Sequence, residues 1–182
     1  MRDGRTGVGA AALLCALVLV GCTPDPAVTP SPSPTATSAT PTETAAERQE
    51  RLDYAAAEKA YRTFRAEYGR VLRAGGAKEP TKVMKETAGG DYLDTFTEVI
   101  RSYRTADSRA IGEERIDYVR FGGYTPTRLV LDVCEDGSNT KIVIPDRSPE
   151  EGEIRTASIE VRKVGSKWKM WSGSGTKVDS CD

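Results

Sequence analysis

Histidine is absent from the 182 residues of this chain. Its absence excludes Ser-His-Asp and Cys-His catalysis and metal centres built on imidazole. The formal net charge is only −1, and basic side chains are interleaved with acidic ones. Nucleic-acid recognition needs a basic excess or patch, so we expect no nucleic acid partner. Glu135-Asp136-Gly137-Ser138-Asn139 predicts a turn between two strands. Together with Asp132 this acidic run departs from the spacing of a calcium loop, and we expect neither a metal nor another cofactor.

Long hydrophobic runs are also scarce, and the clearest one begins near Val8 and closes in Leu19-Val20-Gly21-Cys22. A positively charged start precedes it, and it is short of the ~20 residues of a bilayer span. The pattern is typical of a bacterial lipoprotein signal, with residues 1–21 removed and Cys22 carrying the lipid. An uncleaved signal anchor is the alternative. The resemblance to lipoproteins implies a diacylglyceryl thioether, with acyl chains such as palmitate, that anchors the protein to the outer face of the cytoplasmic membrane, facing the cell wall.

Residues 22–43 form a segment rich in proline, threonine and serine. Six of the ten prolines lie here: Pro24, Pro26, Pro30, Pro32, Pro34 and Pro41. Such a sequence favours extended polyproline-like chain, and at ~3.1 Å per residue it would reach roughly 65 Å. We interpret it as a stalk between the lipid and a single domain, residues 44–182.

Four cysteines occur in the chain, and only Cys134 and Cys181 fall in this domain. In an exported protein a disulfide between them is the simple interpretation. Two reactive thiols are the alternative, but the pair lacks a Cys-x-x-Cys spacing.

The first half of the domain has a helical period. Thr44 with Glu47 predicts a helix start, and Gly75-Gly76 predicts its end, so a long helix covers about Ala45 to Ala74. Apolar residues then recur at three- and four-residue steps: Tyr54, Ala57, Tyr61, Phe64, Tyr68 and Val71. A short helix follows Pro80, and a third opens at Asp91.

The second half alternates with a period of two, which is typical of strands with one buried face. We expect strands over 115–121, 128–133, 140–144 and 156–162, and a last one through Trp168-Lys169-Met170-Trp171. Helices first and hairpin-linked strands afterwards predict an α+β fold with an antiparallel sheet curling around the helices.

This order of elements, ending in Gly165-Ser166-Lys167-Trp168-Lys169-Met170, resembles the cone-shaped NTF2-like (SnoaL-like, cystatin-like) superfamily. It is similar to the lipid-anchored members of actinobacterial envelopes, which also have a stalk and a late cysteine. The resemblance implies three N-terminal helices packed in the concave face of a strongly curved antiparallel sheet. The superfamily includes isomerases and dehydratases as well as non-catalytic binding domains, so the fold alone leaves activity open.

Candidate site residues follow from these patterns. The cone would be lined by seven side chains: Tyr61, Phe64, Tyr68, Phe96, Tyr103, Trp168 and Met170. Strand alternation directs Trp168 inward and Trp171 outward, which makes Trp171 a candidate contact for a partner. We assign no catalytic residue.

We interpret the protein as a non-catalytic, lipid-anchored envelope protein, a monomer or weak homodimer. Its ligand would be a small apolar molecule in the cone or an envelope protein at the sheet. One alternative is a lyase or isomerase with a carboxylate and tyrosine pocket. Another is a regulator of envelope transport, such as a phage-encoded exclusion lipoprotein.

Overall fold

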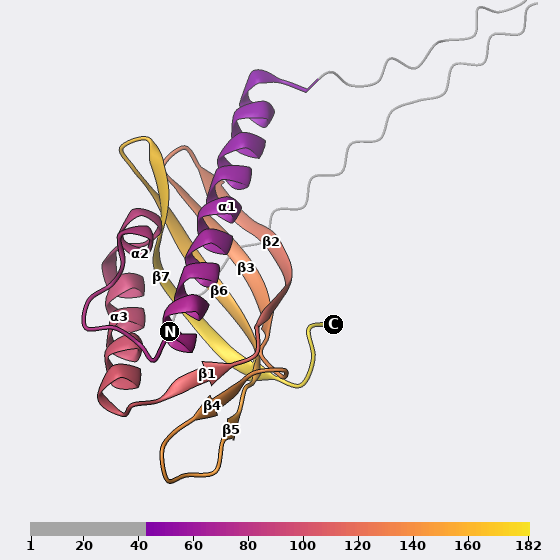
Figure 1. The fold of residues 1–182 in the computed structure, drawn as a ribbon. Coiled ribbons are helices and arrows are strands. Elements are labelled where there is room, and N and C mark those ends of the chain that lie inside the picture. The colour runs from indigo at the N-terminus through magenta and orange to yellow at the C-terminus, as the bar shows by residue number, and fades with distance from the viewer. Residues whose placement is uncertain (1–42) are drawn as a thin grey trace, which may run out of the picture. The chain divides into compact units, whose positions relative to one another are not determined.

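The computed structural model describes residues 43–182 (Figure 1). The expected leader, the lipid-bearing Cys22 and the stalk up to residue 42 lie outside the described residues. Three helices come first: α1 (Ala45–Arg73), α2 (Lys82–Thr87) and α3 (Gly90–Thr105). The strands follow: β1 (Arg109–Ile111), β2 (Arg115–Thr125), β3 (Arg128–Asp136), β4 (Lys141–Val143), β5 (Glu150–Glu151), β6 (Ile154–Val164) and β7 (Lys167–Val178). The predicted α+β class is confirmed.

Helix α1 begins and ends where the sequence predicts. The Thr44 side chain accepts a hydrogen bond from the Glu47 backbone N–H, and the Glu47 carboxylate accepts one from the Thr44 N–H at 2.8 Å, which is a complete capping box. After the helix, Gly75 and Gly76 adopt φ values of +87° and +75°, which a side chain would oppose. A Cβ at Gly76 would also lie 2.2 Å from the carbonyl oxygen of Ile100 on α3, so the chain can turn only with glycine here.

The larger sheet is antiparallel, with the strand order β2-β3-β6-β7 (Figure 1). Its strands alternate as predicted. On β3 the side chains of Leu129, Leu131 and Val133 are buried, and their partners Val161 and Ile159 on β6 are buried too. These residues share one core with the buried stripe of α1, so the helices cover one face of the sheet. Among residues 43–182, no helix lies on the other face.

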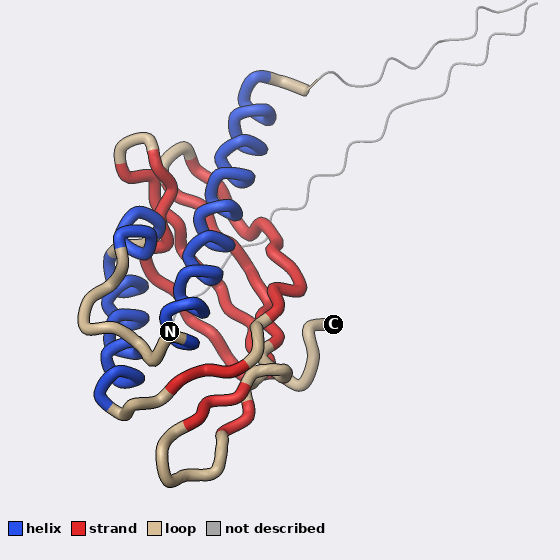
Figure 2. Tube along the Cα trace, viewed as in Figure 1, coloured by secondary structure: helices blue, strands red, loops and turns tan. Residues whose placement is uncertain are grey.

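The structure differs from the sequence prediction in three respects. A second, small sheet of order β1-β4-β5 was not expected, because β1 and β5 are too short to show a period. Strand β2 does not end at Phe121 as predicted but continues to Thr125. At Gly122 and Gly123 its register with β3 shifts, which marks a β-bulge. The strong curvature predicted for the sheet is not confirmed, because the four strands twist without curling tightly (Figure 2).

Candidate functional site

The side chains expected to line an internal pocket are instead packed into the core. Tyr61 and Phe64 are 0% exposed, Trp168 is 4% exposed, and Tyr68 and Met170 are also buried in the same cluster. The expected residue Phe96 is half-buried and packs against that cluster, and Tyr103, which also lies on α3, is buried.

Aromatic contacts hold these rings together. The Phe64 ring centroid lies 5.2 Å from those of Tyr92 and Phe96, both in edge-on arrangements, and the Tyr68 ring lies 4.7 Å from that of Phe96. Edge-to-face packing at these distances is typical of a filled aromatic core. The space between the helices and the sheet is therefore occupied by the protein's own side chains at these positions.

A buried polar cluster joins α1 to β3 within this core. The Tyr61 hydroxyl donates a hydrogen bond to the Glu135 carboxylate. The Nε atom of Arg65 forms an ion pair with Glu135 Oε1 at 2.8 Å, although its N–H is not aligned for a hydrogen bond. The other end of the Arg65 guanidinium donates a hydrogen bond to the Glu114 carboxylate. Glu135 was expected in a turn, but it is the last buried residue of β3, two residues on from Val133 on the same face.

The electrostatics of this cluster favour a structural role. Burial raises the pKa of the Tyr61 hydroxyl well above its usual range, and the Glu135 carboxylate raises it further, so Tyr61 stays protonated. Burial also raises the pKa of Glu135, while Arg65 and the Tyr61 hydrogen bond act to lower it. A carboxylate and a tyrosine are the groups that an isomerase-type site would need, but here each is bonded to the other and enclosed in the core.

A second buried carboxylate, Asp53 on α1, ties that helix to the sheet. It accepts hydrogen bonds from the Tyr124 hydroxyl at 2.8 Å, from Trp168 Nε1 at 2.9 Å and from Lys163 Nζ at 3.2 Å. Burial alone would raise the pKa of Asp53, but these donors, with Trp168 the strongest, lower it overall. The sequence pattern missed Asp53 because it lies beside Tyr54 at the edge of the apolar stripe of α1.

Trp171 does not project outward from the sheet as expected. The register of β6 with β7 shifts at this point, with Glu160 opposite Ser172 and Val161 opposite Met170, so Trp171 is the extra residue of a bulge. Its ring lies against the start of α3, where a Cβ added at Gly90 would be 2.8 Å from the indole. Trp171 is therefore half-buried by its own chain, and its contact with a partner stays a prediction.

The predicted disulfide between Cys134 and Cys181 is present, with the two Cα atoms 5.8 Å apart. Because Leu131, Val133 and Glu135 face the helices, Cys134 lies on the opposite, outer side of β3. The bond therefore holds the chain segment after β7 against the outer face of the sheet.

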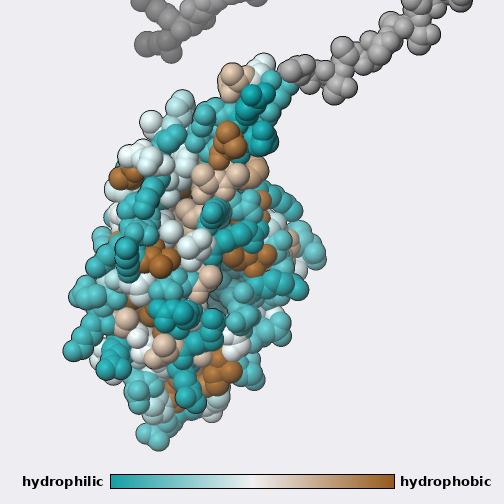
Figure 3. Space-filling view, turned by 45° about the horizontal axis from the view of Figure 1, so that its top comes forward, coloured by the Kyte–Doolittle hydropathy of each residue, from teal (hydrophilic) through white to brown (hydrophobic). Residues whose placement is uncertain are grey.

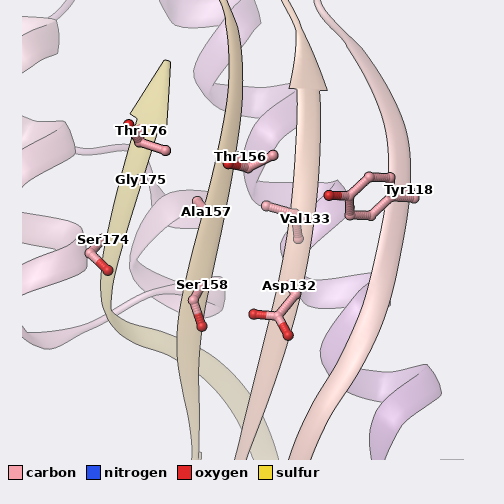
Figure 4. Close-up of a pocket in the computed structure, with 9 residues that line it drawn as sticks. All are labelled: Tyr118, Asp132, Val133, Thr156, Ala157, Ser158, Ser174, Gly175 and Thr176. Carbon is pink, nitrogen blue, oxygen red and sulfur yellow. The ribbon is translucent and has the colours of Figure 1, made fainter. Parts of the chain in front are cut away.

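A hollow of about 370 Å³ opens on this outer face (Figure 4). It crosses all four strands of the larger sheet, and α1 passes behind the sheet in this view. Its lining consists of Tyr118, Asp132, Val133, Thr156, Ala157, Ser158, Ser174, Gly175 and Thr176. None of the seven residues expected to line a pocket is among them. A second hollow, along α1, is lined by that helix alone, from Ala55 to Ala66.

Within residues 43–182, no group of three or more cysteine, aspartate or glutamate side chains is placed to hold a metal ion. No helix in this part of the chain is both long and apolar enough to cross a membrane.

No known family model matches the sequence, and no curated protein is significantly similar to it. Among solved structures, the intermembrane-space region of the chloroplast protein ARC6 is similar at 16% identity and a TM-score of 0.48, over 67% of this chain and 95% of that one. A protein named as a dehydratase of the NTF2-like family from Streptomyces avermitilis is similar at 18% identity and a TM-score of 0.43, over 71% and 99%.

An NTF2-like protein with a cystatin-like fold from Novosphingobium aromaticivorans is similar at 9% identity and a TM-score of 0.42, over 76% of this chain and 93% of that one. Likeness at this level says nothing about what the chain binds or catalyses.

Proposed function

We propose that this protein is a non-catalytic NTF2-like binding domain, with three helices packed on one face of its sheet. A lipid on Cys22 anchors it to the outer face of a bacterial cytoplasmic membrane. It binds a component of the cell envelope through the outer face of the sheet. The single observation that carries this proposal is the filled interior: Tyr61 and Phe64 are completely buried, and the open hollow lies on the other side of the sheet.

The buried polar cluster supports binding over catalysis. A lyase or isomerase would need Glu135 and Tyr61 to reach a substrate, but both are enclosed and bonded to each other, and Arg65 balances the carboxylate charge. An apolar ligand inside the cone would have to displace Phe64 from three aromatic neighbours. Both alternatives would need a conformational change that opens the core.

The helix side offers less to a partner than the sheet side. Figure 3 shows a mostly hydrophilic surface with scattered hydrophobic residues over this part of the molecule. Within residues 43–182, the exposed large hydrophobic side chains are Leu52, Ile111, Phe121 and Val164, and only Leu52 belongs to a helix. Single exposed apolar residues are ordinary, whereas an interaction site gathers its groups together.

Site-specific photo-crosslinking in intact cells tests the proposal. A photoreactive amino acid is placed at Thr176, which is exposed in the outer-face hollow, and in a matched variant at Thr63, which is exposed on α1. We expect a discrete crosslinked product from position 176 and none from position 63. Crosslinking from Thr63 alone would contradict the proposal.

The anchor is tested separately. We expect mass spectrometry of the protein extracted from membranes to show a chain that begins at Cys22 and carries acyl chains. An unmodified chain that begins before Cys22 would refute the lipid anchor.

A further inference from the structure

The hollow on the outer face of the sheet is a trough formed by two parallel rows of side chains that cross the strands. The strand register places Tyr118, Cys134, Thr156 and Thr176 in one row, and Arg120, Asp132, Ser158 and Ser174 in the other. Adjacent rows on one face are two residues apart, or about 6.7 Å, and four strands span about 14 Å. The floor between the rows is the backbone of Val133, Ala157 and Gly175, whose side chains point to the helices or are absent.

The depth of the trough depends on its small side chains. On β6 and β7 the two rows carry only serine and threonine side chains. The larger Tyr118 on β2 and the disulfide-bonded Cys134 on β3 lie at the opposite end of the rows. Tyr118 is held from one side by the Arg120 guanidinium, 4.0 Å from the ring centroid. A cation stacked on one ring face fixes the ring and leaves its other face for a ligand.

The polar groups in the trough are not used by the protein itself. Within residues 43–182, no hydrogen bond or ion pair joins the half-buried Asp132 carboxylate to another side chain, although Ser158 lies directly opposite it. The hydroxyls of Ser158 and Ser174 likewise have no side-chain or backbone partner in this part of the chain. Other hydroxyls in the domain do, such as that of Thr97, which donates to the Leu93 carbonyl at 2.7 Å.

The chemistry of these groups selects the class of ligand. Asp132 is the only charged residue in the lining, but Arg120 stands directly opposite it in the same row, so the two charges offset each other and favour a ligand without net charge. The Asp132 carboxylate only accepts hydrogen bonds, so it needs donor groups on the ligand. Serine and threonine hydroxyls both donate and accept, which suits a ligand whose own groups do both. The methyl groups of Thr156 and Ala157 and the Tyr118 ring supply apolar contact between the polar edges.

We propose that this trough binds an uncharged saccharide of one or two rings. The Asp132 carboxylate accepts from sugar hydroxyls, Ser158 and Ser174 bond to the hydroxyls along the opposite edge, and the Tyr118 ring contacts an apolar sugar face. The volume of about 370 Å³ is in the range of small-ligand sites. This assignment rests on the proposed function, because it names the ligand class of the same outer face.

The test is a titration of the isotope-labelled, purified protein followed by amide NMR signals. The probes are maltose, cellobiose and N,N′-diacetylchitobiose, with the peptide Ala-Lys-Ala as the cationic comparison. We expect saturable shifts from at least one disaccharide, confined to amides of β3, β6 and β7 near Asp132, Ser158 and Ser174. Absence of saturable shifts with all three disaccharides overturns the saccharide assignment, and so does saturable binding of the peptide alone.

Two variants make the result specific. Asp132→Asn keeps the shape and removes the charged acceptor, and we expect about tenfold weaker binding, as for loss of a hydrogen bond to a charged group. Ser158→Tyr fills the trough and should abolish binding. The control Ser102→Ala, on exposed α3 surface, should bind as the unchanged protein does. Full affinity in Asp132→Asn or Ser158→Tyr contradicts the assignment, provided that the tryptophan fluorescence is unchanged.

The photo-crosslinking result separates the two proposals. If Thr176 crosslinks in cells but no disaccharide binds, the outer face has another ligand, so only the saccharide assignment fails. If position 176 gives no crosslink and no saccharide binds, both proposals fail.

Discussion

Replacing Phe64 with alanine tests whether the space between helices and sheet is a core. Phe64 is 0% exposed, so the change gives up about 2 kcal/mol of transfer free energy. A residual cavity of about 50 to 100 Å³ adds about 1 to 2.5 kcal/mol at ~24 cal/mol per Å³. We therefore expect the free energy of unfolding to fall by about 3 to 5 kcal/mol.

The chain offers a matched control in Phe121, which is 51% exposed and packs at a tilt against Tyr54 with ring centroids 4.1 Å apart. Phe121→Ala should cost about 1 kcal/mol, mostly from that aromatic pair. Urea unfolding of the oxidised proteins, followed by tryptophan fluorescence, measures both values. If Phe64→Ala cost no more than Phe121→Ala, the interior would be loosely filled and an internal pocket would be restored as a candidate.

Three further predictions concern the disulfide and the two buried carboxylates. The Cys134–Cys181 bond joins residues 47 positions apart, so its reduction should lower the free energy of unfolding by about 4 kcal/mol. An unchanged urea midpoint after reduction would contradict this. Glu135→Gln should lower the free energy of unfolding by about 3 kcal/mol, because it leaves the buried Arg65 guanidinium without one of its carboxylate partners. The exposed control Glu153→Gln should lower it by under about 1 kcal/mol. Equal urea midpoints for the two variants would refute the structural role of the buried cluster. Because the pKa of Asp53 is lowered in the folded state, its contribution to stability is present above about pH 4 and is lost as the pH falls further. The Asp53→Asn variant cannot lose this contribution, so its stability should fall less steeply with pH in acid-unfolding curves.

The helices could be predicted from the sequence because their signals are local. The capping box at Thr44, the glycines after α1 and the three- and four-residue spacing all act within a few residues. The inward face of β3 and β6 followed from alternation for the same reason. The disulfide followed from export and from the small number of cysteines.

The site could not be predicted in this way because it depends on which strands lie side by side. Asp132, Ser158 and Ser174 are far apart in the chain and meet only through the register of β3, β6 and β7. Trp171 was misplaced because a bulge shifts alternation by one residue, which no local pattern shows. Glu135 looked like a turn residue because its partners, Tyr61 and Arg65, come from a distant helix.

The most direct test of the central claim is a crystal structure of the protein purified from its native envelope, inspected for any molecule that it retains. We expect Tyr61, Phe64 and Trp168 to fill the interior, and a retained molecule to lie in the outer trough beside Asp132. A molecule enclosed between the helices and the sheet, with Phe64 displaced, would contradict the account.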